Sequence, residues 1–164
     1  MQTQYKSCAF SGHRDIPEAD ITQIYAHLTT LLRELIDNGC TDFYAGGALG
    51  FDTIAALIVL QLRGEYPDIK LHLLLPYADQ SGAWQQSDCD TYEFIKSHSN
   101  SFEYLSKDYY RGCMQARNKA LVDKSELVVC YMTRNIGGTA NTIRYAKSCG
   151  RRVINIAPAV SALK

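Results

Sequence analysis

The sequence predicts a single α/β domain in which a doubly wound, mainly parallel sheet carries helices on both faces. Three observations support this prediction. Short apolar segments alternate with segments of helical periodicity along the whole chain. The segments between successive strands are long enough for right-handed helical crossovers, which favour parallel pairing. The 164 residues contain no internal repeat, linker or low-complexity tract, so residues 1–164 are expected to form one domain.

In the first half of the chain, each element follows from local pattern. The expected strands are 7–10, 42–45 and 70–75, each a short apolar run. Apolar residues recur at helical spacing from Ile21 to Asn38, where an Asn-Gly pair gives a stop. Asp52 or Thr53 can cap a second helix that runs to about Arg63. Residues 77–87 are the least regular stretch and contain the chain's tryptophan, Trp84.

The second half repeats the alternation. The expected strands are 102–105, 127–131 and 153–156, and the expected helices are 90–97, 114–124 and 138–148. A loop is expected at 109–112. Strand, helix and strand therefore continue to alternate up to the end of the pattern.

Composition excludes several classes of function. Lysine and arginine (17) balance aspartate and glutamate (17), so the chain lacks the basic excess typical of nucleic-acid binding. Six cysteines are scattered singly with no C-x-x-C, which favours reduced core thiols and gives no metal site. Neither a signal peptide nor an apolar stretch of about 18 residues is present, and we expect a cytoplasmic protein that makes no contact with membranes.

Three glycine-bearing turns are the most informative feature for function. They occupy residues 11–14, 46–52 and 136–139, and each lies between an apolar strand and a helical segment. If the strands are parallel, the three turns meet at one edge of the sheet. Backbone amides and helix N-termini that converge there form a pocket for an anion such as phosphate. The turns therefore predict a nucleotide-like ligand.

The candidate ligand-binding residues lie in these turns and at the start of the 114–124 helix. They are Ser11, Gly12, His13, Arg14, Gly46, Gly47, Gly50, Asp52, Arg117, Asn118, Gly137, Gly138 and Thr139. Arginine offers a planar fork that matches phosphate oxygens, so Arg117 is the expected charge clamp. Asn118 and Asp52 can address a sugar or base, and His13 is a candidate acid–base group.

Each of these assignments has a structural alternative. The 46–50 turn can be a tight packing turn without a ligand, and the 137–139 turn an ordinary helix start. Arg117 can lie on a solvated helix face. No acidic residue closes the 70–75 strand, which argues against a standard dinucleotide site, and no P-loop pattern is present.

Two further groups also have two readings. The aromatic and amide side chains Tyr77, Gln80, Trp84 and Tyr92 follow a strand end, where they can stack on a base or pack onto a neighbouring helix. The basic residues Arg144, Lys147, Arg151 and Arg152 lie in or just beyond the second half of a predicted helix. Cations at that position complement the helix dipole, so they do not by themselves indicate nucleic-acid binding.

The motifs in this order resemble those of the SLOG superfamily, and most closely its YpsA-like branch. They are Ser11-Gly12-His13-Arg14, the 46–52 turn, Arg117-Asn118 with residues 121–126, and Gly137-Gly138-Thr139 with Thr142 and Tyr145-Ala146. The resemblance covers residues 7–156. It implies a Rossmann-like fold and a nucleotide or nucleotide-derived ligand held by the glycine turns, with a homodimer as a further expectation.

The same superfamily contains LOG-type phosphoribohydrolases, which cleave an N-glycosidic bond, and DprA-like proteins, which bind single strands. The phosphoribohydrolases carry a proline before the double glycine and a glutamate six residues after its second glycine. Here these positions hold Ile136 and Arg144. Asp52 is the carboxylate placed to substitute in sugar–base cleavage.

The first functional hypothesis is therefore a sensor or regulatory module that binds a nucleotide-like molecule and needs no cofactor. An N-glycosidase acting through Asp52 is the alternative. Single-stranded nucleic-acid binding is a second alternative.

Overall fold

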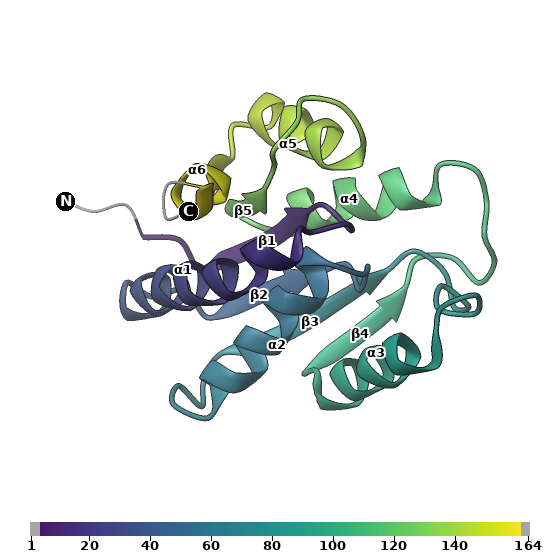
Figure 1. Ribbon diagram of the computed structural model, residues 1–164, viewed down its shortest axis with the longest axis horizontal. Coiled ribbons are helices and arrows are strands. Elements are labelled where there is room, and N and C mark those ends of the chain that lie inside the picture. The colour runs from purple at the N-terminus through teal and green to yellow at the C-terminus, as the bar shows by residue number, and fades with distance from the viewer. Residues whose placement is uncertain (1–3, 162–164) are drawn as a thin grey trace.

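A computed structural model describes residues 4–161, which form a six-stranded parallel sheet with helices on both faces (Figure 1). The strands are β1 (Ser7–Gly12), β2 (Asp42–Ala45), β3 (Lys70–Leu75), β4 (Ser101–Tyr104), β5 (Leu127–Tyr131) and β6 (Arg152–Asn155). The helices are α1 (Glu18–Asp37), α2 (Phe51–Arg63), α3 (Gln86–His98), α4 (Cys113–Lys124), α5 (Gly138–Ser148) and α6 (Ala157–Ser161). The predicted doubly wound, Rossmann-like α/β architecture is confirmed.

The strand order β4-β3-β2-β1-β5-β6 places a switch point in the middle of the sheet. The chain moves outward from β1 to β4 and then returns to lay β5 against the other side of β1, with Ala9 beside Val128. The loops after β1 and β5 therefore diverge to opposite faces. In open α/β sheets, this divergence leaves a crevice outside the carboxyl ends of the strands.

Two apolar layers hold the sheet between its helices. On one face, Phe10 and Phe43 stack with ring centroids 6.0 Å apart and pack with buried residues of α1 and α2. On the other face, Val128 and Cys130 pack with Ile143 of α5 and with Val122. Since both faces are covered around β5, all five of its residues are buried. This explains why that strand is a continuous apolar run.

Several element boundaries differ from the expected ones. Helix α1 begins at Glu18, directly after Pro17 at the N-cap, and Glu18 and Asp20 in its first turn complement the helix dipole. Helix α3 begins at Gln86, four residues before the expected start. Helix α6 was not predicted, since five residues are too few for a periodic pattern.

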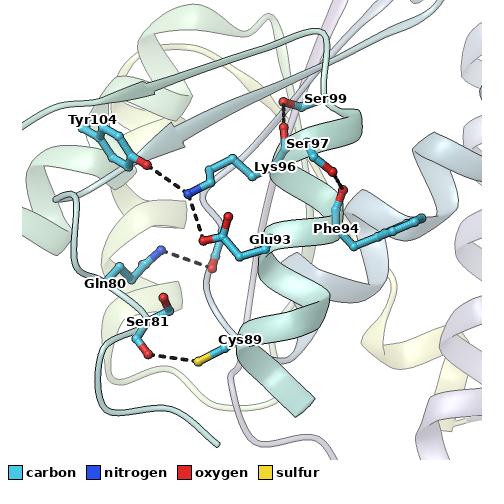
Figure 2. Close-up of polar contacts among 10 residues, drawn as sticks. Gln80, Ser81, Cys89, Glu93, Phe94, Lys96, Ser97, Ser99 and Tyr104 are labelled. Carbon is cyan, nitrogen blue, oxygen red and sulfur yellow. Dashed lines mark hydrogen bonds and ion pairs between the residues drawn. The ribbon is translucent and has the colours of Figure 1, made fainter. Parts of the chain in front are cut away.

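Polar contacts attach α3 to the segment before it and to the edge strand β4 (Figure 2). The Cys89 thiol donates to the carbonyl of Ser81 (3.3 Å). The Lys96 ammonium donates to Glu93 within the helix and to the hydroxyl of Tyr104 on β4, each at 3.0 Å. Within residues 4–161, no helix is long and apolar enough to cross a membrane.

Candidate functional site

A cleft of about 450 Å³ opens where the carboxyl ends of the central strands meet the first turns of α4 and α5. Its volume lies in the range typical of small-molecule sites, roughly 300–1,000 Å³. Ten predicted site residues line it: Ser11, Gly12, His13, Arg14, Asp52, Arg117, Asn118, Gly137, Gly138 and Thr139. The three glycines of the second turn, Gly46, Gly47 and Gly50, are not among the lining residues. Segments up to 128 residues apart in sequence thus share one cavity.

The turn before α5 presents bare backbone to the cleft. Gly137 precedes the helix with φ of 98°, in the left-handed region that favours glycine, and no side chain caps the helix start. Gly138 has no positive φ, and a Cβ built there, as at Gly137, meets no atom within 4 Å. Protein packing therefore does not require glycine at position 138. The first amides of an α-helix lack intrahelical partners, so this turn can bind an anion.

The glycines of the β2–α2 turn are explained by close packing. A Cβ at Gly46 would lie within 3 Å of the Arg117 side chain, and one at Gly47 would meet the Leu75 side chain at 2.5 Å. A Cβ at Gly50 would overlap the backbone that follows β1, and its φ of 82° also favours glycine. These contacts support the packing alternative for this turn, and any ligand-binding role of its three glycines stays a prediction.

Arg117 lies in the floor of the cleft rather than on a solvated face. Its side chain is buried, and Nη1 donates to the carbonyl oxygen of Gly46. Nε donates to Oδ1 of Asn118 at 2.9 Å. Burial lowers the pKa of Arg117, and the nearby Asp52 carboxylate opposes this shift. Part of the guanidinium is therefore engaged by the protein itself, and the charge sits beneath any bound ligand.

Asp52 faces Arg117 from the first turn of α2. Its Oδ2 accepts the backbone N–H of Ala48 at 3.3 Å, and the side chain is buried. Burial raises the pKa of Asp52 to about 6, although the Arg117 charge and the backbone hydrogen bond act in the opposite direction. This carboxyl therefore changes its protonation state close to neutral pH.

His13 connects two loops of the cleft. Its Nε2 accepts the backbone N–H of Thr133 at 2.9 Å, so the neutral ring carries its proton on Nδ1. Burial, and then the charge of Arg134, lower the pKa of His13, which favours this neutral form. An amide N–H keeps its proton, so Nε2 is not free to serve as the acid–base atom, and only Nδ1–H remains for a ligand.

Two exposed arginines rim the cleft, and only one of them was expected. Arg14 follows β1, and Arg134 follows β5 at the equivalent place across the switch point. Within the part of the chain that the structure describes, neither donates a hydrogen bond or forms an ion pair. Arg134 was not identified from the sequence as a site residue, and neither was Asp15, which follows Arg14. Their position directly after strand ends was the signal that could have identified them.

The remaining wall of the cleft is aromatic. Tyr77, Gln80 and Trp84 line it, and Gln80 donates to the carbonyl of Gly47 at 3.3 Å. Tyr92 instead packs beneath this wall, where it meets Trp84 edge to face with centroids 5.4 Å apart. The packing alternative therefore holds for Tyr92, and stacking of a base on the residues that line the cleft stays a prediction. The cleft combines cations and free amides at one side with planar apolar surface at the other.

Comparison with known proteins places this geometry in a family. The model of the YspA SLOG family matches residues 3–150. A UPF0398 protein of Bacillus thuringiensis (strain Al Hakam) is 28% identical over 122 residues, which are 73% of this chain and 66% of the relative. The chain therefore matches about two thirds of that relative's length.

Two solved structures share the fold. DNA processing protein A from Helicobacter pylori has a TM-score of 0.61 and 24% identity, with 90% of this chain and 63% of that chain covered. The homologous protein from Streptococcus pneumoniae has a TM-score of 0.64 and 18% identity, with 91% and 52% covered. The fold, the order of the motifs and the match over residues 3–150 agree, and the chain belongs to the YspA SLOG family.

Proposed function

We propose that the cleft binds a nucleotide or a nucleotide-derived small molecule, and that the protein acts as a sensor or regulatory module. The observation that carries this proposal is Gly138, a glycine at an uncapped helix start with open space where its side chain would be. No residue between 4 and 161 fills that space, which suits the close approach of a phosphate to the helix amides.

Charge and shape in the rest of the cleft support the same ligand class. Arg14 and Arg134 supply positive charge at the rim, and Arg117 supplies it from the floor. Trp84 and Tyr77 offer planar surface on which a base can stack. A ligand with an anionic group at one end and an aromatic ring at the other satisfies both sides.

Calorimetric titration with the four common ribonucleoside monophosphates and their nucleosides tests the proposal. We expect at least one monophosphate to bind, and its nucleoside to bind more weakly because the phosphate contacts are missing. Hydrogen bonds to a charged group contribute about 1.5–3 kcal/mol, which corresponds to roughly 10- to 150-fold in affinity. Equal affinities for a nucleotide and its nucleoside would show that the phosphate does not bind at the turn before α5.

Gly138→Ala is the decisive variant. Because a Cβ at this position has open space within the protein, the variant should fold normally and lose phosphate affinity. Gly64→Ala is the matched control, since Gly64 lies at the far end of α2 with helical backbone angles. Equal affinity for Gly138→Ala and the parent protein would contradict the proposed phosphate position.

The same mixtures test the enzymatic alternative, in which Asp52 stabilises positive charge on a sugar during N-glycosidic cleavage. Chromatography of the incubated nucleotides detects any freed base. Base release that disappears in Asp52→Asn would show that the protein is a hydrolase and would contradict a function limited to binding.

Single-stranded nucleic acid is the second candidate, and one observation favours it. Tyr109 and Tyr110 are 64% and 47% exposed, and Tyr109 contacts the cleft residue Tyr77 with ring centroids 5.5 Å apart. Exposed aromatic rings beside a cationic cleft are typical of surfaces on which successive bases stack. The Helicobacter pylori relative in fold is described as binding single-stranded DNA.

A gel shift with a labelled oligonucleotide separates this candidate from a small-molecule site. Binding that falls steeply with salt and weakens in Tyr109→Ala would support nucleic acid. No complex at low salt would dismiss it.

A further inference from the structure

A second group of chemically reactive side chains lies away from the cleft, towards the amino ends of β2, β3 and β4. The His72 ring joins two neighbours: its Nδ1 lies 2.7 Å from Oγ of Ser101, and its Nε2 lies 2.8 Å from Oδ1 of Asp42. Adjacent strands fix this arrangement, because His72 is the register partner of Ser101 on β4 and of Tyr44 on β2. A hydroxyl, an imidazole and a carboxylate thus form one hydrogen-bonded line.

Hydrogen-bond chemistry determines which way the protons point in this line. Asp42 accepts the Thr41 hydroxyl through Oδ2 (2.8 Å) and the imidazole through Oδ1. Partial burial raises the pKa of Asp42, but the hydrogen bonds from His72 and Thr41 outweigh it and leave the pKa below its ordinary value. A carboxylate only accepts, so Nε2 of His72 carries the proton. In the neutral ring, Nδ1 then offers its lone pair to the O–H of Ser101.

Access and orientation suit a reaction at this hydroxyl. Ser101 is exposed on the edge strand, whereas the His72 side chain is 18% exposed. The ring of Tyr44 stacks on the imidazole with centroids 4.8 Å apart and an interplanar angle of 28°. Tyr44 and Asp42 therefore both hold the imidazole in place, while Ser101 is exposed.

We propose that Ser101 is a nucleophile activated by His72 and oriented through Asp42, and that it takes acyl groups from small activated esters or thioesters. Serine next to a base that a third group orients is the arrangement used for covalent acyl transfer on unrelated folds. Ser101 Oγ forms a bond to the carbonyl carbon, and its proton passes to Nδ1 of His72. The carbonyl–oxygen or carbonyl–sulfur bond breaks, and His72 returns the proton to the leaving alkoxide or thiolate. Water then cleaves the acyl-serine, with His72 taking and returning its proton in the same way.

Ser97 provides an internal comparison (Figure 2). It is also exposed and lies 3.1 Å from an imidazole, that of His98. However, its hydroxyl donates to the carbonyl of Phe94 at 2.9 Å, and Nδ1 of His98 lies 2.9 Å from the same carbonyl oxygen. Nδ1 of His98 is therefore a donor, and it leaves Ser97 without a base. Serine lies within hydrogen-bond distance of histidine at both sites, and the proton arrangement distinguishes them.

The experiment uses the full chain at pH 8 with p-nitrophenyl acetate and with a fluorophosphonate probe. Release of nitrophenolate reports turnover, and peptide mapping by mass spectrometry locates the adduct. We expect the adduct on Ser101 and not on Ser97. His72→Gln should slow labelling by about 10²-fold or more, which is the contribution of a positioned general base.

Three comparisons make the result decisive. Ser101→Ala should abolish the adduct, Asp42→Asn should slow it because the ring loses its anionic acceptor, and Ser97→Ala should leave it unchanged. Circular dichroism and thermal unfolding verify that each variant is folded. An adduct absent from Ser101, equal labelling of Ser97, or an unchanged rate in folded His72→Gln would each overturn the proposal.

Discussion

Asp52 gives the protein a stability that depends on pH in an unusual direction. A typical carboxyl group in a folded protein is stabilised as the anion, so stability falls on acidification. Asp52 is buried beneath the cleft, and burial raises its pKa to about 6 from the ordinary value of 3.8. The folded state therefore binds this proton more tightly than the unfolded state does, and stability should decrease as pH rises from about 4 to 6.

The magnitude follows from the pKa difference. One pKa unit corresponds to 1.36 kcal/mol, so a shift of about two units amounts to about 3 kcal/mol over the whole titration. Most of this change, about 2–3 kcal/mol, falls between pH 4 and pH 7. The Arg117 charge already reduces the shift, and without it the pKa of the Asp52 carboxyl would lie higher.

Urea unfolding followed by circular dichroism at pH 4, 5, 6 and 7 measures the effect. The relevant quantity is the unfolding free energy of the parent minus that of Asp52→Asn, because other titrating groups cancel in the difference. We expect this difference to fall by about 2–3 kcal/mol across the range. Asp15→Asn, which removes an exposed carboxylate from the same cleft, controls for the change of charge. A difference that stays constant with pH would show that folding does not raise the pKa of Asp52.

Three further substitutions probe the fold. Tyr131→Phe removes the buried hydrogen bond to Asp20 (2.7 Å) and should lower the unfolding free energy by about 1–3 kcal/mol in the same urea assay; an unchanged value would mean that the bond contributes nothing. Glu65→Gln breaks an exposed two-point ion pair with Arg33 (2.8 and 2.9 Å) and should cost at most about 1 kcal/mol, an effect that must shrink in high salt. Leu73→Ala in the centre of β3 should cost about 2–5 kcal/mol, and a loss below about 1 kcal/mol would contradict the tight packing of that side chain.

The fold was predictable because its main signals are local. Buried parallel strands such as 127–131 are continuous apolar runs, and the long helix that begins at Glu18 has clear periodicity. Helix α3 was placed too late because Gln86, Ser87 and Asp88 at its start are polar, so periodicity gives no sign of where it begins.

The position of the cleft was predictable, but its detail only in part. Strand ends followed by glycine identified the edge of the sheet at which the cleft opens. In the cleft, two hydrogen bonds join residues that are 71 and 120 apart in sequence, Arg117 with Gly46 and His13 with Thr133. Away from the cleft, His72 and Ser101 are 29 residues apart. No local pattern specifies such pairs, since they depend on how the crossovers pack. The sequence offered a packing role for the β2–α2 glycines as one alternative, but it did not identify the side chains they pack against, for the same reason.

The pairing of β1 with β5 has a consequence for how the protein acquires its cavity. Cys8 is hydrogen-bonded in register with Leu127, so the first and the fifth strand must find one another across a loop of more than a hundred residues. Closing so long a loop is entropically costly and slows folding. We therefore expect the cavity to be among the last parts to assemble during folding. A molecule that occupies it can then recognise only the completed chain, and its binding energy adds directly to global stability.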